Sequence, residues 1–440
     1  MSPKALAGLF LSIVLVANAT ASNDAERFWP QWRGPTANGV SPSGNPPTEW
    51  SETKNVHWKI AMPGAGSSTP VLWGNRLYVT TAVPFGARQT SAAQRQPRRN
   101  WGPPPNPDAS RRHRFLVLAI DRSTGETVWE TTVREALPHA GTHEFGNFAT
   151  ASAMTDGEHV WAFFGSRGLF CLDMEGRILW EKDFGDMRTH MSFGEGASPV
   201  LHDEFIVVPW DHNGESFVAA LRKITGEQVW KTERDEITSW STPRVVEYDG
   251  VAQVITNATN RVRSYDLATG ELLWESSGMT RNVIPTPVAA DGIVYVMSGF
   301  RGNALQAIRL EGARGDITGS DAILWEMDRD TPYTASPLLY DGTLYFMKRN
   351  SHILSVVDAA SGERHYQERL GSLNDVFSSP VGAAGRVYVT GRQGTTVVLE
   401  GGSEYKVLAT NSLDDDFDAS MVVVDGEIYL RGKNLYRISE

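Results

Sequence analysis

The chain has 440 residues, a formal net charge of −11, 41% hydrophobic residues and a single cysteine, Cys171. The negative charge argues against nucleic acid as a main partner, because phosphate backbones attract basic surfaces. A lone cysteine cannot form an intramolecular disulfide, so packing and strand pairing must hold the fold together. We interpret Cys171, which lies between Phe170 and Leu172, as a small buried hydrophobic residue rather than a reactive thiol.

The first 21 residues have the layout of a secretory signal peptide. Lys4 precedes an apolar run at residues 5–17, and Ala19-Thr20-Ala21 forms an A-x-A cleavage site. The apolar run is too short to span a bilayer stably, so we expect no transmembrane span. We therefore expect export to the periplasm or secretion, with residues 22–440 as the folded part. No cysteine lies near the cleavage site, so a lipoprotein anchor is not supported.

A short apolar strand that opens behind a Ser or Thr, usually with a Pro, recurs eight times along the chain. After one long first interval the openings recur every 41 to 50 residues, which is the period of a four-stranded propeller blade. The pattern predicts an all-β fold, an eight-bladed β-propeller of four-stranded antiparallel blades. The openings are Ser68-Thr69-Pro70-Val71, Ser152-Ala153-Met154, Ser198-Pro199-Val200, Ser241-Thr242-Pro243-Arg244, Pro285-Thr286-Pro287-Val288, Ser336-Pro337-Leu338, Ser379-Pro380-Val381 and Ser420-Met421-Val422.

A glycine turn followed four residues later by an aromatic recurs in the expected fourth strand of the blades. In residues 238–278, the most regular blade, Thr269-Gly270 turns the chain into a strand that carries Trp274. Glycine suits such hairpins because it accepts a positive φ. We expect these aromatics to pack between blades as a structural repeat. The tryptophans at this position are Trp58, Trp129, Trp180, Trp230, Trp274 and Trp325.

Trp58 lies in a fourth strand, residues 55–60, that has no blade before it. The last repeat, residues 420–438, has only three strands. We therefore expect the N-terminal strand to complete blade eight, since an open ring would leave two unpaired edges.

The long first interval contains an insertion at residues 84–114 that is rich in Arg, Pro, Gln and Asn. One interpretation is a solvated, disordered loop between the second and third strands of blade one. The other is a basic tether for an anionic surface or partner.

Residues 119–129 match the A-x-D-x-x-x-G-x-x-x-W tryptophan-docking repeat of the PQQ-like β-propellers. Residues 264–274 keep this repeat with Ser for Ala, and residues 220–230 keep it with Arg222 for Asp. The resemblance covers residues 29–440. It implies one of two functions: a non-catalytic scaffold of the BamB-like type, or a quinoprotein oxidoreductase that holds pyrroloquinoline quinone and a calcium ion in the centre of the propeller.

The chain length and the eight short blades resemble the BamB-like propellers more closely. In dehydrogenases of the methanol and alcohol type, adjacent cysteines form a ring above the quinone, which one cysteine makes impossible. We therefore favour a non-catalytic binding or assembly scaffold, a monomer without a cofactor, with an envelope or secreted protein partner. The alternative is an oxidoreductase that binds the quinone and calcium at the channel mouth. The missing lipobox cysteine is the departure from BamB.

The segments that lead into the innermost strands of a propeller gather at one mouth of its channel. Here nearly every such segment carries a charged or amide group and an aromatic, which could hold a cation, a sugar or a quinone. The alternative is that they are solvated polar strand ends. No catalytic group is predicted, because the sequence supports no Ser/His/Asp or Cys/His grouping. No metal site is predicted, because His139 and His143 lack the H-E-x-x-H order. The candidate ligand-binding residues are Glu144, Asn147, His190, Glu195, Asp235, Trp240, Arg281 and Asn282.

Overall fold

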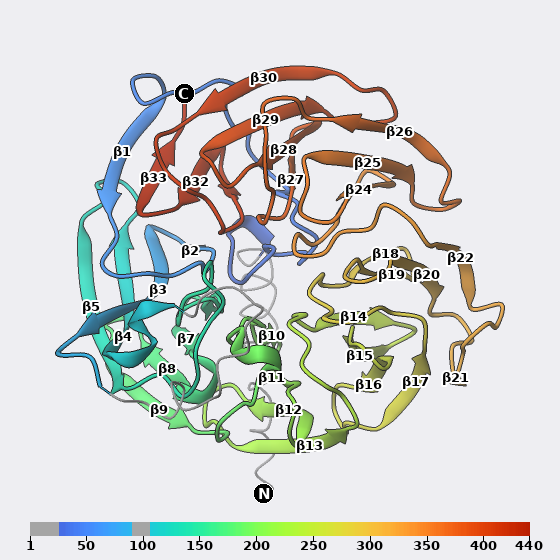
Figure 1. The fold of residues 1–440 in the computed structure, drawn as a ribbon, viewed down its shortest axis with the longest axis horizontal. Coiled ribbons are helices and arrows are strands. Elements are labelled where there is room, and N and C mark those ends of the chain that lie inside the picture. Colours follow the sequence, from blue (N-terminus) through green and yellow to red (C-terminus); the bar gives the residue numbers. More distant parts are fainter. Residues whose placement is uncertain (1–25, 90–105) are drawn as a thin grey trace, which may run out of the picture.

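Eight β-sheets stand in chain order around a central axis and close into a ring (Figure 1). The computed structural model describes residues 26–89 and 106–440; the predicted leader at 1–21 and residues 90–105 of the predicted insertion lie outside this part. Seven of the sheets have four strands and one has five. The prediction of an all-β, eight-bladed propeller is confirmed.

The blades are built from consecutive strands, the first of each blade being innermost. Blades one to four contain β2 (Val71–Trp73), β3 (Arg76–Phe85), β4 (Arg112–Asp121) and β5 (Thr127–Ala136); β6 (Met154–Thr155), β7 (His159–Phe163), β8 (Leu169–Asp173) and β9 (Ile178–Lys182); β10 (Val200–His202), β11 (Phe205–Trp210), β12 (Ser216–Arg222) and β13 (Gln228–Arg234); β14 (Arg244–Tyr248), β15 (Val251–Thr256), β16 (Val262–Asp266) and β17 (Leu272–Ser276).

The remaining four blades follow the same order. They contain β18 (Val288–Ala290), β19 (Ile293–Ser298), β20 (Ala304–Arg309) and β22 (Ile323–Met327); β23 (Leu338–Tyr340), β24 (Thr343–Met347), β25 (Ile353–Asp358) and β26 (Arg364–Arg369); β27 (Val381–Ala383), β28 (Arg386–Thr390), β29 (Thr395–Glu400) and β30 (Val407–Ser412); β31 (Val422–Val424), β32 (Glu427–Arg431) and β33 (Asn434–Ile438) with β1 (Val56–Ala61). Short 3-10 turns are η2 (Pro107–Ser110), η3 (Gly165–Arg167) and η4 (His190–Ser192).

Each blade is buried on both faces because it packs between two neighbours. Between blades three and four, for example, Val218 and Trp230 of one blade pack in the same cluster as Val254 of the next. The strands in the middle of a blade are therefore almost continuously buried, as in the third strands β8 and β12. The outer strand β1 instead alternates half-buried and exposed residues. Apolar burial between the faces of neighbouring blades is what holds the ring.

The two faces of the ring carry different loops. We use the term upper face for the face that carries two sets of loops: those that enter each innermost strand and those between the second and third strands. The turns that join strands one and two, and strands three and four, lie on the lower face, because successive strands are antiparallel.

The N-terminal strand closes the ring as predicted. β1 pairs antiparallel with β33, with Trp58 opposite Arg437 and Ile60 opposite Leu435. The Trp58 indole packs on the turn of blade one at Gly125, where a β-carbon would lie 2.9 Å from the ring, and its N–H donates to the Arg122 carbonyl at 3.1 Å. Closure thus joins the first and last parts of the chain within one sheet.

The insertion predicted at 84–114 is shorter at both ends than expected. Pro84 and Phe85 belong to β3, and residues 112–114 begin β4, because the two strands remain paired as far as Phe85 and Arg112. The guanidinium groups of Arg112 and Arg114 lie 5.8 and 5.0 Å from the centroid of the Phe85 ring. These cation–π contacts favour continued pairing of the hairpin.

Blade four departs from the predicted four strands. The longer third connection of blade five contains β21 (Gly315–Asp316), which pairs in parallel with β17 at the outer edge of blade four. Trp274, on β17, is accordingly fully buried, and its N–H donates to the Gln253 side chain in its own blade at 3.1 Å.

Candidate functional site

A belt of hydrogen bonds joins the blade openings around the channel. In each link the backbone N–H of one opening donates to the Ser or Thr hydroxyl of the next, at 2.9 to 3.1 Å. The links run from Thr69 to Ser152, Ser152 to Ser198, Ser198 to Thr242, Thr286 to Ser336, Ser336 to Ser379, Ser379 to Ser420, and Ser420 back to Thr69. The hydroxyls that open the blades therefore satisfy amides that have no ladder partner.

The belt is interrupted between blades four and five. Here the Ser241 hydroxyl and the Asn257 amide both donate to the Pro285 carbonyl at 3.0 Å. The buried Thr286 hydroxyl has no partner in the described part of the chain.

The N-terminal segment at residues 29–41 closes the lower end of the channel by bonding to innermost strands around the ring. Trp29 pairs with Leu72 of blade one, and Val40 forms a bridge with Gly382 of blade seven. Arg33 is fully buried and donates to the carbonyls of Pro337 and Pro380, of blades six and seven, at 2.7 Å each. Further contacts reach blades two, three and five through Thr155, Leu201 and Ala289.

Above this segment the channel contains a cavity of about 210 Å³. Trp32 of the N-terminal segment contributes to its wall, together with six hydroxyls of the belt. Trp240, Phe145 and Phe377 add aromatic surface, and Asp418 is the one carboxylate among the described lining residues.

The mouth of this cavity is covered by an ion pair packed against aromatics. The Asp418 carboxylate accepts two hydrogen bonds from Arg392, at 2.5 and 3.3 Å. The Arg392 guanidinium lies 4.2 Å from the centroid of Phe145 and 4.6 Å from that of Phe377. Burial raises the pKa of Asp418, and the charge of Arg392 opposes this rise. Loops from different blades thus meet over the mouth.

A second, smaller cavity of about 50 Å³ lies beside the channel on the upper face. Of the predicted residues, it brings together Asn147, Glu195 and Trp240. Glu195 accepts hydrogen bonds from the Ser166 N–H at 2.6 Å and the Ser166 hydroxyl at 2.5 Å. Desolvation raises the pKa of Glu195 despite these bonds. Asn147 donates to the Ser67 hydroxyl at 2.6 Å, and the Trp240 indole N–H donates to the Gly194 carbonyl at 2.8 Å, so all three side chains already have protein partners.

The other predicted residues line neither cavity. Glu144 and Arg281 are exposed, and Asn282 is buried beside Arg281. The Asp235 carboxylate pairs with Arg263, which lowers its pKa although partial burial acts in the opposite direction. Desolvation, with the charges of Arg301 and Arg281, lowers the pKa of His190.

Four features of the channel were not among the predicted site residues: the belt, Trp32, the Asp418–Arg392 pair and the Phe145–Phe377 contact. The Ser and Thr of the belt were visible in the sequence as repeated openings. The hydrogen bonds between these openings were not visible in the sequence, because each hydroxyl bonds to an opening about one blade away. The Phe145 and Phe377 rings, 6.1 Å apart, are separated by most of the chain.

The channel residues do not fit a calcium ion with a tricarboxylate quinone. Calcium takes about six to eight oxygen ligands, usually with carboxylates, and Asp418 is committed to Arg392. The described residues that line the cavity include no Lys or Arg to receive carboxylates. The one group of three metal-ligand side chains in the described part of the chain, His202, Asp203 and Glu247, lies at strand ends on the lower face.

Fold and cavity together define a closed, eight-bladed PQQ-like propeller whose channel is blocked at one end by its own N-terminal segment. Comparison with protein families agrees. The chain belongs to the family described as outer membrane protein assembly factor BamB, whose model matches residues 47–198, 113–277 and 214–439.

Two curated relatives carry different names. The chain is 22% identical over 332 residues to the outer membrane protein assembly factor BamB of Yersinia pestis, covering 72% of this chain and 69% of that protein. It is 24% identical over 370 residues to the tetrathionate hydrolase of Acidithiobacillus ferrooxidans, covering 77% of this chain and 66% of that protein. The family therefore has relatives named for assembly and for catalysis.

Solved structures with this fold likewise include an assembly factor and dehydrogenases. BamB from Moraxella catarrhalis superimposes with a TM-score of 0.59 at 12% identity, covering 88% of this chain and 99% of that one. A europium-containing methanol dehydrogenase gives a TM-score of 0.61 at 10% identity, covering 93% and 91%. At these identities the likeness concerns the fold alone.

Proposed function

We propose that this protein is a non-catalytic scaffold of the cell envelope that holds a protein partner on its upper face. Membership of the family described as an outer membrane assembly factor supports this function, and the predicted leader supports the location. In the part of the chain that the structure describes, no helix is both long and apolar enough to cross a bilayer.

The observation that carries the proposal is that the carboxylate lining the channel cavity is already paired within the protein. The hydroxyls around the cavity accept hydrogen bonds in the belt, and its carboxylate, Asp418, is held by Arg392. A catalytic site needs groups that are free to bind or move a proton. A rigid ring with a covered channel instead presents loops for recognition.

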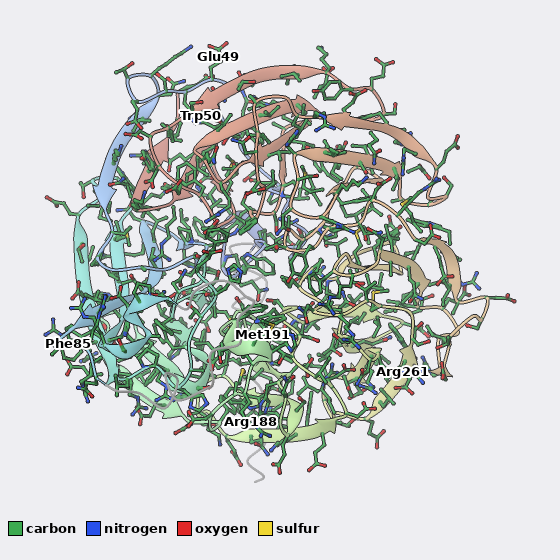
Figure 2. All side chains as sticks on the ribbon, viewed as in Figure 1. Glu49, Trp50, Phe85, Arg188, Met191 and Arg261 are labelled. Atoms are coloured by element: carbon green, nitrogen blue, oxygen red, sulfur yellow. The ribbon has the colours of Figure 1, made fainter. Side chains whose placement is uncertain are left out.

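The upper face exposes large apolar side chains around the channel mouth. Phe145, Met191 and Ile237 are 46%, 41% and 41% exposed, and Figure 2 shows Met191 near the middle of the ring, on η4. Met191 also has a φ of 52°, a conformation that costs energy in a non-glycine residue. Apolar residues exposed together around a mouth are typical of partner-binding surfaces.

Thermal unfolding with and without pyrroloquinoline quinone and calcium separates the scaffold from its oxidoreductase rival. We expect no saturable shift of the melting temperature, because the cavity lacks free carboxylates for calcium. A saturable stabilisation that depends on calcium would overturn the scaffold proposal.

Partner capture tests the upper face directly. After mild crosslinking in an envelope extract, the wild-type protein should retain a defined protein partner, and Met191→Glu or Ile237→Glu should weaken that capture. Leu179→Glu is the matched control, because Leu179 is 51% exposed on the outer strand β9. Equal capture by all three variants, or no partner for the wild type, would contradict the proposal.

A further inference from the structure

Three arginines lie in upper-face loops of blades five and six, which are neighbours in the ring (Figure 1). Arg281 lies in the loop that enters blade five, Arg301 in the β19–β20 loop and Arg349 in the β24–β25 loop. All three are exposed, and none pairs with a carboxylate in the described part of the chain. We call these three residues the arginine cluster.

Backbone contacts and one aromatic pair hold the cluster together. Arg281 forms a β-bridge with Phe300, and the Arg301 guanidinium lies 5.5 Å from the centroid of the same Phe300 ring. The Phe300 and Tyr333 rings stack with centroids 4.9 Å apart. The Tyr333 N–H in turn donates to the Arg349 carbonyl at 3.4 Å. A stacked aromatic pair therefore lies next to all three arginines.

The backbone at the cluster is strained, and a buried amide side chain lies beside it. Arg301, Arg349 and Asn282 each have a φ of 54°, in the left-handed region that side chains disfavour. Such outliers concentrate at binding sites. Asn282 is only 5% exposed. Burial raises the pKa of Tyr333, and a hydrogen bond with the Asn282 side chain opposes that rise, so the two side chains lie in contact.

The charges around the cluster leave it positive. Asp330 is the acidic group between these loops, and its two oxygens are taken by Lys348 at 2.9 Å and Arg364 at 3.0 Å. The three unpaired arginines give these neighbouring loops of the described chain a local positive charge, in a chain whose net charge is −11. Carboxylates brought to the cluster would neutralise that charge.

We propose that the arginine cluster and the Phe300–Tyr333 pair bind an acidic segment of the protein partner. Guanidinium groups match carboxylates with paired N–H donors, and the aromatic pair offers apolar surface to side chains between the acidic residues. A short acidic peptide is favoured over nucleic acid because the protein's overall negative charge repels a long polyanion. This inference rests on the proposed scaffold function and names the chemistry of its partner.

A direct binding assay tests the cluster without knowledge of the partner. The probe is a fluorescein-labelled ten-residue peptide of alternating Glu and Tyr, titrated at several salt concentrations. The triple variant Arg281→Glu, Arg301→Glu, Arg349→Glu should weaken binding about tenfold or more and flatten its salt dependence, as expected for the loss of three exposed ion pairs. Arg314→Glu is the matched control, since Arg314 is also exposed and lacks a carboxylate partner within the described ranges; it should change affinity less than twofold.

Four outcomes would overturn the inference: no saturable binding, equal losses in the triple variant and the control, tighter binding of a ten-nucleotide single strand, or tighter binding of anionic phosphatidylglycerol vesicles. If the triple Glu variant does not fold, the triple Gln variant is used, which removes the charges without reversing them. Crosslinking capture separates this inference from the proposed function. If the wild-type protein captures a partner and the triple variant captures it equally well, only the role of the arginine cluster is refuted. If the wild-type protein captures no partner, the scaffold function itself is refuted.

Discussion

The Ser and Thr residues that open the blades act as hydrogen-bond acceptors between blades. An amide at the start of an innermost strand faces the channel and has no neighbouring strand to bond with. The hydroxyl of the next blade supplies the acceptor, as in the 3.0 Å bond from the Thr286 N–H to the Ser336 Oγ. One small side chain in every blade except blade five thereby joins neighbours that share no sheet.

Ser336→Ala should reduce the free energy of unfolding by about 1–3 kcal/mol, because it leaves the buried Thr286 N–H without an acceptor. Thr286→Val is the control, since the Thr286 hydroxyl accepts no hydrogen bond in the described residues. We expect that control to change stability by less than about 1 kcal/mol. Urea unfolding measures both, and equal losses would show that the belt does not stabilise the ring.

Asp415 stabilises the last loop of blade eight through its ionised form. It accepts hydrogen bonds from the backbone N–H of Lys433 and Asn434, at 2.9 and 2.8 Å, and from the Asn434 side chain. Desolvation would raise its pKa, but these bonds outweigh it and lower the pKa below the ordinary value. The stabilisation is therefore present above the unfolded-state pKa of about 4 and is lost as the pH falls through the lower folded-state value.

Asp415→Asn should lower the free energy of unfolding at pH 7 by about 1–3 kcal/mol, because hydrogen bonds to a charged acceptor are lost. The difference between wild type and variant should shrink as the pH falls from about 5 to 2. Urea midpoints across this range test the sign, and a difference that stays constant with pH would contradict the role of the ionised carboxylate.

At the scale of elements, the N-terminal segment at residues 29–41 behaves as a strut across the lower end of the channel. Its central side chain, Arg33, has no carboxylate partner among residues 26–89 and 106–440 and donates there only to backbone carbonyls. Burial lowers the pKa of Arg33 to about 9, which shows the cost of placing a charge there. The bonds across the axis, to blades six and seven, offset that cost.

Arg33→Met keeps the apolar stem but removes the three donated bonds. We expect it to lower the free energy of unfolding by about 1–3 kcal/mol and to speed hydrogen exchange in β27, where Gly382 donates to the Gly39 carbonyl at 3.0 Å. Arg27→Met, at an exposed ion pair with Asp425, should change stability by less than about 1 kcal/mol. Unchanged exchange in β27 would refute the strut.

At the scale of the whole molecule, the ring is closed by the pairing of β1 with β33. Every other blade takes its four antiparallel strands in consecutive order along the chain, and β21 only adds to the edge of blade four, so loss of an outer strand there leaves the ring intact. Loss of β1 would separate the two ends of the chain and expose the edge of β33, which invites association with other copies. The stability of the whole propeller therefore depends on one six-residue strand.

Trp58→Pro with Ile60→Pro should detach β1, since proline cannot donate to the strand ladder and costs about 3 kcal/mol or more in regular structure. The control variant, Trp230→Pro with Thr232→Pro, places two prolines in the outer strand β13 of blade three. The β1 variant should melt clearly lower and scatter light as oligomers, whereas the control should remain monomeric. Equal behaviour of the two variants would refute closure by β1.

Much of this architecture could be predicted from the sequence because it depends on local patterns. Blade number follows from the period of the openings, and the positions of Trp129 and Trp180 follow from the preceding glycine turns. Closure follows from counting strands, because Trp58 has no blade before it and the last repeat lacks a strand. Each inference uses residues a few positions apart, where turn chemistry and strand alternation act directly.

The site was predicted less well, because ring curvature rather than chain proximity decides which loops meet. Glu195 and Asp235 lie in upper-face loops, where Glu195 bonds to Ser166 and Asp235 pairs with Arg263. No local pattern indicates that Arg33 would cross the axis, or that Arg281, Arg301 and Arg349 would gather on one face. By itself the sequence determined the repeat, the blade count and the strand that closes the ring. Only the tertiary structure decided which side chains remain free, because that depends on partners brought together from distant blades.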